Sequence, residues 1–195
     1  MSLKIDFENI EQKCIDAAGT EEYELLVGKV KKAKKIFLVG NGGLHFVANH
    51  MATDLTRLID NKVVYSFESV GFITSNANDH GFEKMFVRWL ETVCAVEDPD
   101  DCLIIGLSCS GNSSNVIRSL HWGHENNFPT FLISGQKSLA LRGEVDQLCF
   151  NCEYFHTVEV MCLMVFYDLI HRAGSHCPSI TEEKKRMADS PLRKV

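Results

Sequence analysis

The chain has 195 residues, of which 45% are hydrophobic and 24% are charged. This composition is typical of one globular domain and excludes a disordered, collagen-like or coiled-coil protein. The formal net charge of −6 disfavours a surface that binds nucleic acid or membranes, although it is compatible with a local anion pocket. No stretch reaches the roughly 20 apolar residues of a membrane span, so we expect no membrane partner.

The eight cysteines bear on the cellular compartment. Most lie in apolar runs, such as those around Cys102 and Cys162, where cysteine behaves as a small buried hydrophobic residue. Cys149 and Cys152 form a lone CxxC pair without the second pair of a zinc finger, which favours a structural role. The N-terminus lacks the charged and then apolar layout of a signal peptide. The sequence therefore predicts reduced thiols in a cytoplasmic protein.

Helical and strand patterns alternate along the chain. Apolar residues at helical spacing predict an N-terminal helix over about residues 4–32. Continuous apolar runs predict strands at residues 36–39, 63–66, 102–107, 129–133 and 147–150. Further helices are predicted up to about residue 59, over residues 82–96, up to about residue 126, and over residues 154–172. We expect the last segment, about residues 174–195, to be a peripheral or frayed tail.

Continuous apolar strands that alternate with helices are typical of a parallel sheet covered on both faces. The sequence thus predicts a single α/β domain over residues 1–195, with a doubly wound five-stranded parallel sheet, a core at about residues 36–173 and an extra N-terminal helix. Ligands of such sheets bind beyond the carboxyl ends of the strands. Two loops rich in glycine or serine follow predicted strands and are the first candidates for a binding site.

The serine-rich loop at residues 108–113 reads SCSGNS. Its hydroxyls, together with free N–H groups at the start of the next helix, can surround a phosphate. It lacks the lysine of nucleotide-hydrolase loops, which favours a phosphomonoester over a nucleotide with magnesium. The alternative is an ordinary capping turn, because serine and asparagine are common at helix starts. Three hydroxyls and a glycine in one short loop favour the phosphate site.

The glycine-rich loop at residues 40–43 reads GNGG and permits close backbone approach, although Asn-Gly is also a plain turn signal. On the helix after it, His50 and Asp54 are spaced i and i+4 and share one face, so they can ligate one zinc ion. For an isolated pair, an exposed helix contact is the commoner explanation. His156 and Glu159 stand at i and i+3 in the last helix, and spacing alone does not make His156 a ligand.

Together these residues resemble the sugar isomerase (SIS) fold, a flavodoxin-like arrangement. They resemble more closely the phosphoheptose isomerase family, which makes the heptose precursor of bacterial lipopolysaccharide. The resemblance spans about residues 8–172. Its carriers are GNGG at residues 40–43, His50 and Asp54 at the family spacing, NDHGFE at residues 78–83, SCSGNSSNV at residues 108–116 and DLIH at residues 168–171.

The resemblance implies interconversion of sedoheptulose 7-phosphate and D-glycero-D-manno-heptose 7-phosphate in a homotetramer whose active sites lie between subunits. It also implies a zinc ion, which the family holds with two histidines, a glutamate and a glutamine. The glutamate and one histidine have acid/base roles there. Carried over by position, phosphate contacts fall on Ser108, Ser110, Asn112 and Ser113. Other substrate contacts fall on Asn41, Gly42, Gly43 and Asp79, and His50 matches a zinc histidine.

Four positions depart from the family pattern. Leu44 replaces a serine that helps to hold the phosphate. Asp54 replaces the glutamate that is both base and ligand, and its carboxylate is set back by one methylene. His156 replaces the glutamine and is a better zinc ligand than an amide. Met164 replaces the second catalytic histidine, and it can neither transfer protons nor bind zinc well.

The resemblance therefore implies a Zn²⁺ site formed by His50, Asp54 and His156, with an open position for substrate oxygens. Proton transfer through an enediol then falls to Asp54, or to His156 where that ring is not bound to metal. Glu159 and His80 are secondary candidates for this role.

We expect a metal-assisted aldose–ketose isomerase that acts on a phosphorylated sugar. The alternative is a non-catalytic phosphosugar-binding SIS protein with a regulatory or assembly role. Leu44 and Met164 fit a site that has lost its chemistry. His156 in place of glutamine instead fits a remodelled metal site, which favours the enzyme.

Overall fold

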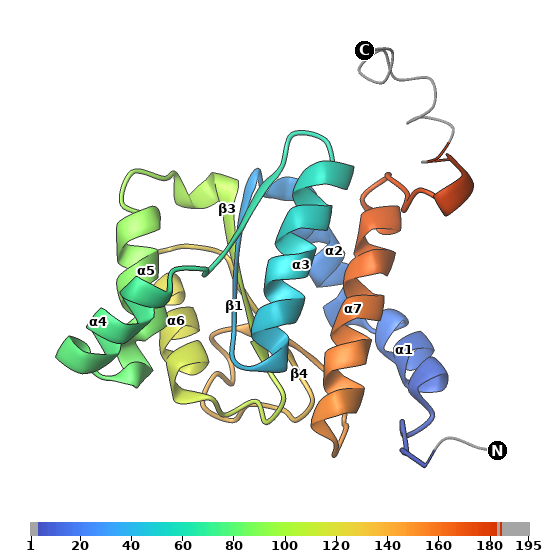
Figure 1. The fold of residues 1–195 in the computed structure, drawn as a ribbon, viewed down its shortest axis with the longest axis horizontal. Coiled ribbons are helices and arrows are strands. Elements are labelled where there is room, and N and C mark those ends of the chain that lie inside the picture. Colours follow the sequence, from blue (N-terminus) through green and yellow to red (C-terminus); the bar gives the residue numbers. More distant parts are fainter. Residues whose placement is uncertain (1–3, 183, 185–195) are drawn as a thin grey trace.

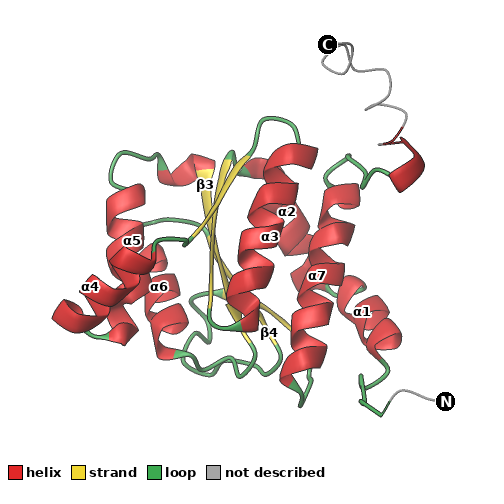
Figure 2. Ribbon diagram, in the orientation of Figure 1, coloured by secondary structure: helices red, strands yellow, loops and turns green. Residues whose placement is uncertain are grey.

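The computed structural model describes residues 4–182 and residue 184. Its centre is a five-stranded parallel sheet in the order β2-β1-β3-β4-β5 (Figures 1 and 2). The strands are β1 (Lys35–Gly40), β2 (Val63–Ser66), β3 (Cys102–Ser108), β4 (Thr130–Ser134) and β5 (Asp146–Cys149). The predicted doubly wound sheet is confirmed, and every strand lies within about one residue of its predicted bounds.

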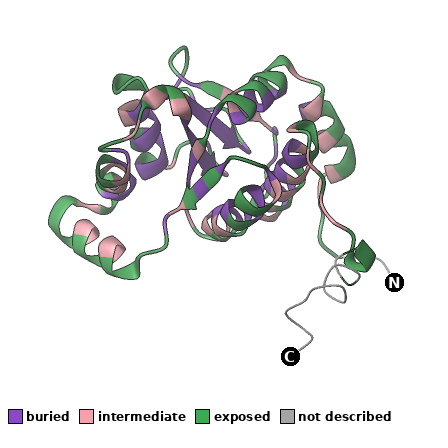
Figure 3. Cartoon of the chain, turned by 90° about the horizontal axis from the view of Figure 1, so that it is seen from above, coloured by how far each residue is buried: buried purple, intermediate pink, exposed green. Residues whose placement is uncertain are grey.

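Helices cover both faces of this sheet, so β3 and β4 are buried along their whole length. On one face, Ile36 and Leu38 of β1 pack in a core with α2 (Glu21–Lys32), α3 (Gly43–Leu58) and α7 (Phe155–Arg172). On the other face, Phe37 and Val39 pack with α5 (Met85–Val93) and α6 (Ser114–Glu125). The buried layers on either side of the strands stand out in Figure 3.

The prediction of one N-terminal helix is wrong, because the chain forms α1 (Ile10–Ala18) and α2 with a break between them. Gly19 ends α1, and Thr20 has an extended backbone with φ −89°. The Thr20 hydroxyl accepts a hydrogen bond from the Tyr23 N–H at 3.2 Å and donates one to the Ala17 carbonyl at 2.7 Å. A threonine that caps the second helix in this way satisfies one of its free N–H groups, so the chain turns there.

The helix α4 (Val70–His80) is absent from the predicted elements. It has no buried side chain, and it lies at the edge of the molecule beside α5 (Figure 1). Its apolar residues are few, and Phe72 and Ile73 are only partly buried against the core, so the sequence analysis did not identify it. The Ser69 hydroxyl begins it by accepting a hydrogen bond from the Phe72 N–H at 3.2 Å. Short 3-10 turns lie at Phe82–Lys84 and Pro99–Asp101.

Three further sequence predictions concern membrane spans, the cysteines and the C-terminal tail. None of the helices in the described residues is long and apolar enough to cross a membrane. All eight cysteines lie in the described part, and each is a free thiol. Most of the expected peripheral tail, at residue 183 and residues 185–195, lies outside the described residues.

Candidate functional site

A pocket of about 300 Å³ opens where the two predicted loops meet the last helix. The loops follow β1 and β3, which are neighbours in the sheet, so both lie at its carboxyl edge as expected for a ligand site. The lining residues come from three places in the sequence: Asn41, Gly42, Gly43 and Leu44; Cys109, Ser110 and Ser113; and Phe155 and Glu159 on α7.

The serine-rich loop is held in a defined shape by its own hydrogen bonds. The hydroxyls of Ser108 and Ser113 lie 3.0 Å apart, and the Asn112 N–H donates to the Ser110 hydroxyl at 3.2 Å. Gly111 has φ +65°, and a Cβ there would overlap the backbone carbonyl of Gln136. Only glycine combines this backbone angle with such a close approach. The loop therefore presents Ser110 and Ser113 to the pocket at the start of α6.

The two loops are tied together by a pair of asparagines. The Asn41 amide donates to the Asn115 carbonyl oxygen at 2.8 Å, and the Asn115 amide donates back to Asn41 at 2.9 Å. Asn115 is buried, so this reciprocal pair fixes the spacing between the loops. Asn115 was missed at the sequence level. The sequence feature that could have identified Asn115 is its place in the first turn of a predicted helix, directly after the serine-rich loop.

Glu159 brings a carboxylate into the pocket. Its oxygens lie over Gly43 in the first turn of α3, where any Cβ would overlap them. Glu159 is half-buried, and within the described residues it makes no hydrogen bond or ion pair. Burial raises the pKa of the neighbouring Cys109 thiol to about 11, and the Glu159 charge adds to this effect. Cys109 is therefore protonated at neutral pH. Among the described residues, no lysine or arginine lines the pocket.

His50 and Asp54 form a separate cluster with Tyr167, where α3 and α7 lie side by side (Figure 1). The His50 Nε2 atom is 3.6 Å from the Asp54 carboxylate and 2.8 Å from the Tyr167 hydroxyl, which donates to Asp54 at 3.4 Å. Arg57 reaches the same carboxylate at 3.4 Å. Burial raises the pKa of Tyr167, and the Asp54 charge adds to this. Tyr167 was missed by the sequence analysis.

His156 does not join that cluster. Its Nε2 atom lies 2.8 Å from the Asp6 carbonyl oxygen, and its ring stacks on Tyr154 and meets Phe7 edge-on. His156 and Tyr167 are eleven residues apart on α7, which separates them by about 16 Å along the helix axis.

The predicted zinc ligands His50, Asp54 and His156 are thus not brought together within one chain. The physical reason is that His50 and Asp54 contact Tyr167 in the C-terminal half of α7, whereas His156 lies in the first turn of that helix. Nowhere in residues 4–182 or at residue 184 do three His, Cys, Asp or Glu side chains form a group that could hold a metal ion. The arrangement of the described residues does not fit the three-ligand site.

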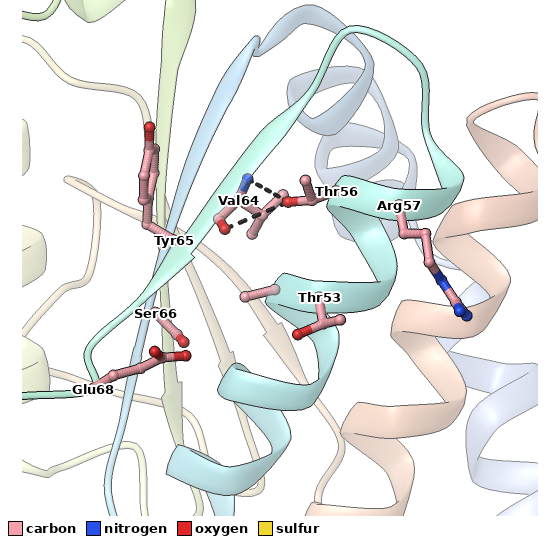
Figure 4. A pocket seen from close by; sticks show the side chains of 8 residues that line it. Thr53, Thr56, Arg57, Val64, Tyr65, Ser66 and Glu68 are labelled. Atoms are coloured by element: carbon pink, nitrogen blue, oxygen red, sulfur yellow. Dashed lines mark hydrogen bonds between the residues drawn. The ribbon is translucent and has the colours of Figure 1, made fainter. Parts of the chain in front are cut away.

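A larger cavity of about 460 Å³ lies between α3 and the edge strand β2 (Figure 4). The Thr56 hydroxyl accepts a hydrogen bond from the Val64 N–H at 2.8 Å there and so covers part of the open strand edge. The residues that line this larger cavity are not among the predicted site residues, and of them only Arg57 forms an ion pair with one, Asp54. The candidate site is therefore the smaller pocket at the carboxyl edge of the sheet.

Comparison with known proteins identifies the family. No protein-family model matches the chain. A phosphoheptose isomerase from Hamiltonella defensa is 32% identical over 126 residues, which are 63% of this chain and 59% of that protein. A phosphoheptose isomerase from Aquifex aeolicus is 30% identical over 142 residues, which are 70% of this chain and 68% of that protein. The chain belongs to the phosphoheptose isomerase family.

Solved structures share the fold at lower identity. The phosphoheptose isomerase GmhA from Neisseria gonorrhoeae superposes with a TM-score of 0.72 and 18% identity, over 86% of this chain and 92% of that chain. The NanR protein of Vibrio vulnificus, complexed with ManNAc-6P, gives a TM-score of 0.59 and 16% identity, over 95% of this chain and 68% of that chain. The SIS fold expected from the sequence is confirmed.

The other residues that the family resemblance singled out lie in different parts of the molecule. Leu44, in place of the family serine, is buried at the pocket. Met164, in place of the family histidine, is partly exposed, and its sulfur lies 3.6 Å from the Cys14 sulfur. Asp79 and His80 lie exposed at the end of α4, where Asp79 accepts a hydrogen bond from Asn78 at 2.8 Å. Neither lines the pocket in the single chain.

Proposed function

We propose that this chain is an aldose–ketose isomerase of a phosphorylated sugar. Sedoheptulose 7-phosphate, converted to D-glycero-D-manno-heptose 7-phosphate in the cytoplasm for surface polysaccharide, is the first substrate to test. The observation that supports this most is a pocket that joins a serine-rich loop, a glycine-rich loop and a carboxylate at the carboxyl edge of the sheet, and this carboxylate has no partner among the described residues. Membership of the phosphoheptose isomerase family supports the same reaction.

The phosphate would be held by hydroxyls and peptide N–H groups. Ser110 and Ser113 face the pocket at the N-terminal end of α6, where the free N–H groups and the helix dipole favour an anion. Leu44 removes one hydroxyl that the family uses, so we expect weaker phosphate binding than with a serine there. A hydrogen bond to a charged group contributes about 1.5–3 kcal/mol, so Ser110→Ala should raise Kd by roughly 10- to 100-fold.

The reaction needs a base that moves a proton between C1 and C2 of the open-chain sugar, and donors that stabilise the enediol oxygens. The family implies zinc at this step. His50, Asp54 and His156 do not meet in the described chain, so these three residues do not form that zinc site within one subunit. The groups that the pocket itself offers are the hydroxyls of the serine-rich loop and the carboxylate of Glu159.

The direct test is proton NMR of sedoheptulose 7-phosphate with the full chain in D₂O, with and without added Zn²⁺. Enediol formation exchanges the C1 hydrogens for deuterium even when net conversion is slow. We expect exchange with the phosphorylated sugar, none with sedoheptulose itself, and a reduced rate in Ser110→Ala at limiting substrate. Thr92→Ala, which removes an exposed hydroxyl on α5 outside the pocket, is the matched control. No exchange under any condition would contradict the isomerase proposal.

A non-catalytic phosphosugar-binding protein is the second candidate. Two observations favour it: Asp54, at the family position of the base, is engaged by Arg57 and Tyr167, and the fold is shared with NanR, a protein solved with ManNAc-6P. Binding of sedoheptulose 7-phosphate by calorimetry, with no C1 exchange by NMR, would support this candidate over the enzyme.

We also expect a homotetramer, as the family resemblance implies. In the single chain α4 has no buried side chain, and Asp79 is outside the pocket. Assembly that places α4 against a neighbouring chain would explain both features. Light scattering after size-exclusion chromatography measures the mass directly, and a mass of one 22.0 kDa chain would contradict this expectation.

A further inference from the structure

The Asp54 carboxylate is contacted by a tyrosine that the sequence analysis did not identify. The hydroxyl of Tyr167, on α7, lies 2.8 Å from the His50 Nε2 atom and 3.4 Å from one Asp54 carboxylate oxygen. The family resemblance places the base of the isomerisation at Asp54. We propose that Tyr167 is a positioning residue of the isomerase and that its hydroxyl orients the Asp54 carboxylate. This inference rests on the proposed function.

The three side chains form one chain of hydrogen bonds. A tyrosine hydroxyl has a single proton, and a carboxylate can only accept, so Tyr167 donates to Asp54. The Tyr167 oxygen then accepts from His50, which places the proton of the neutral imidazole on Nε2. The direct distance from His50 Nε2 to Asp54 is 3.6 Å, too long for a good hydrogen bond. The Tyr167 hydroxyl is therefore the link between His50 and Asp54.

Tyr167 is also the more rigidly held of the two groups that can orient Asp54. The last torsion of an aspartate side chain is broad, so its carboxylate turns easily unless its oxygens are held. Tyr167 contacts Oδ2 and Arg57 contacts Oδ1, each at 3.4 Å. The Arg57 side chain is 58% exposed, so water competes for it. The Tyr167 ring instead packs against the core and meets the His50 ring edge-on.

These contacts orient the carboxylate and leave it able to accept a proton. Strong hydrogen bonds to a carboxylate are about 2.5–2.9 Å long, so contacts of 3.4 Å withdraw little of its charge. Burial raises the pKa of Tyr167, and the Asp54 charge adds to this, so the hydroxyl keeps its proton and remains a donor. A base must lie within hydrogen-bond reach of the proton that it removes, so the direction of its oxygens affects the rate.

The Asp54 cluster is separate from the phosphate pocket of its own chain. Gly43 and Asp54 are eleven residues apart on α3, about 16 Å along the helix axis. The His50 side chain is 53% exposed, so the cluster is open to a molecule outside the chain. In the proposed homotetramer, with active sites between subunits, the phosphate pocket of one chain would meet the Asp54 cluster of another. Tyr167 needs no such neighbour to hold Asp54, because both residues belong to one chain.

The test compares chemistry with binding in Tyr167→Phe. The two readouts are C1 exchange of sedoheptulose 7-phosphate in D₂O at saturating substrate, and the Kd of the corresponding heptitol 7-phosphate, which cannot enolise. Misplacing a reacting group by about 1 Å costs about 100-fold, so we expect the exchange rate to fall by about 10- to 100-fold. The Kd of the heptitol phosphate should stay within about threefold of wild type, because the hydroxyl lies outside the phosphate pocket.

Tyr23→Phe is the matched control. The Tyr23 hydroxyl donates to the Asp168 carboxylate at 2.6 Å, outside both the Asp54 cluster and the pocket. This variant removes the same hydroxyl from a carboxylate, so it should lose stability and keep its C1 exchange within about threefold of wild type. A loss of exchange in Tyr23→Phe equal to that in Tyr167→Phe would show that both variants act through stability, and would contradict the proposal.

A double variant shows whether Tyr167 acts through Asp54. In the Asp54→Asn background, Tyr167→Phe should cause no further loss of exchange, because no carboxylate is left to orient. A further loss of about 10-fold in that background would mean that the hydroxyl acts on the substrate or on another residue, and would overturn the positioning role.

Three other outcomes decide against the proposal. Wild-type exchange in Tyr167→Phe would make the cluster purely structural and leave the isomerase function intact. Loss of heptitol phosphate binding together with exchange would make Tyr167 a binding or folding residue. Absence of exchange in the wild-type chain would overturn the isomerase function and the role of Tyr167 together.

Discussion

At the scale of single residues, Gly43 tests whether the pocket depends on the Glu159 carboxylate. An added Cβ at Gly43 would overlap only the far end of a flexible side chain, so Glu159 can move away. Alanine also favours the first turn of α3 by up to about 1 kcal/mol over glycine. We therefore expect Gly43→Ala to keep its stability within about 1 kcal/mol of wild type while its C1 exchange at limiting substrate falls, because the displaced carboxylate crowds the phosphate pocket. Urea unfolding and NMR exchange measure the two effects.

Gly111 provides the contrast to that variant. Its φ of +65° is unfavourable for alanine, and an added Cβ would overlap the rigid backbone carbonyl of Gln136. Strain of this kind costs of the order of 1–3 kcal/mol. Gly111→Ala should therefore lose stability as well as phosphate binding. Equal stability losses in Gly43→Ala and Gly111→Ala would contradict the placement of Glu159 over Gly43.

Tyr167 tests the cluster on the opposite part of α7. Its hydroxyl lies 2.8 Å from the His50 ring and donates to Asp54 at 3.4 Å, so Tyr167→Phe leaves a buried carboxylate with one partner fewer. We expect a loss of about 1 kcal/mol in the free energy of unfolding, measured in urea. A loss below about 0.3 kcal/mol would mean that water replaces the hydroxyl, and that the cluster contributes little to stability.

At the scale of elements, the break between α1 and α2 depends on one hydroxyl. Thr20 caps α2 through its bond from the Tyr23 N–H and ties back to α1 through the Ala17 carbonyl. Thr20→Ala should lower the free energy of unfolding by about 1 kcal/mol, whereas Thr20→Ser keeps the hydroxyl and should stay within about 0.5 kcal/mol of wild type. Urea unfolding with circular dichroism measures both, and equal losses would point to the methyl group instead.

Among the helices, strands and loops, the sequence could predict some positions and not others. The strands were predictable because continuous apolar runs mark buried parallel strands, and the serine-rich loop because glycine and hydroxyls stand directly after β3. The positions of Glu159 and Tyr167 were not, because they depend on how α7 is rotated against α3. The described chain does not bring His156 to the other predicted zinc ligands, because its ring lies against Asp6, eleven residues along α7 from the Tyr167 that contacts His50.

At the scale of the whole molecule, buried thiols make stability fall at alkaline pH. Burial raises the pKa of Cys94 to about 12 and of Cys102 to about 11, and that of the fully buried Cys162 well above its ordinary value of 9.0. Below pH 9 these thiols are protonated in both the folded and the unfolded chain, so they add no pH dependence. Above pH 9 only the unfolded chain releases their protons, which favours unfolding.

The size of this effect is measurable by urea unfolding between pH 7 and 11 with a reductant present. Each fully shifted thiol lowers the free energy of unfolding by about 1.4 kcal/mol per pH unit above pH 9, so these three contribute up to about 4 kcal/mol per unit. Cys14 and Cys109, whose pKa values are raised to about 11, steepen the decline further. Cys94→Ala leaves a cavity and should start lower at pH 7, yet its decline above pH 9 should be shallower by about 1.4 kcal/mol per unit. The slope therefore reports ionisation while the value at pH 7 reports packing. A Cys94→Ala curve parallel to wild type would show that this thiol ionises as readily in the fold as in the unfolded chain.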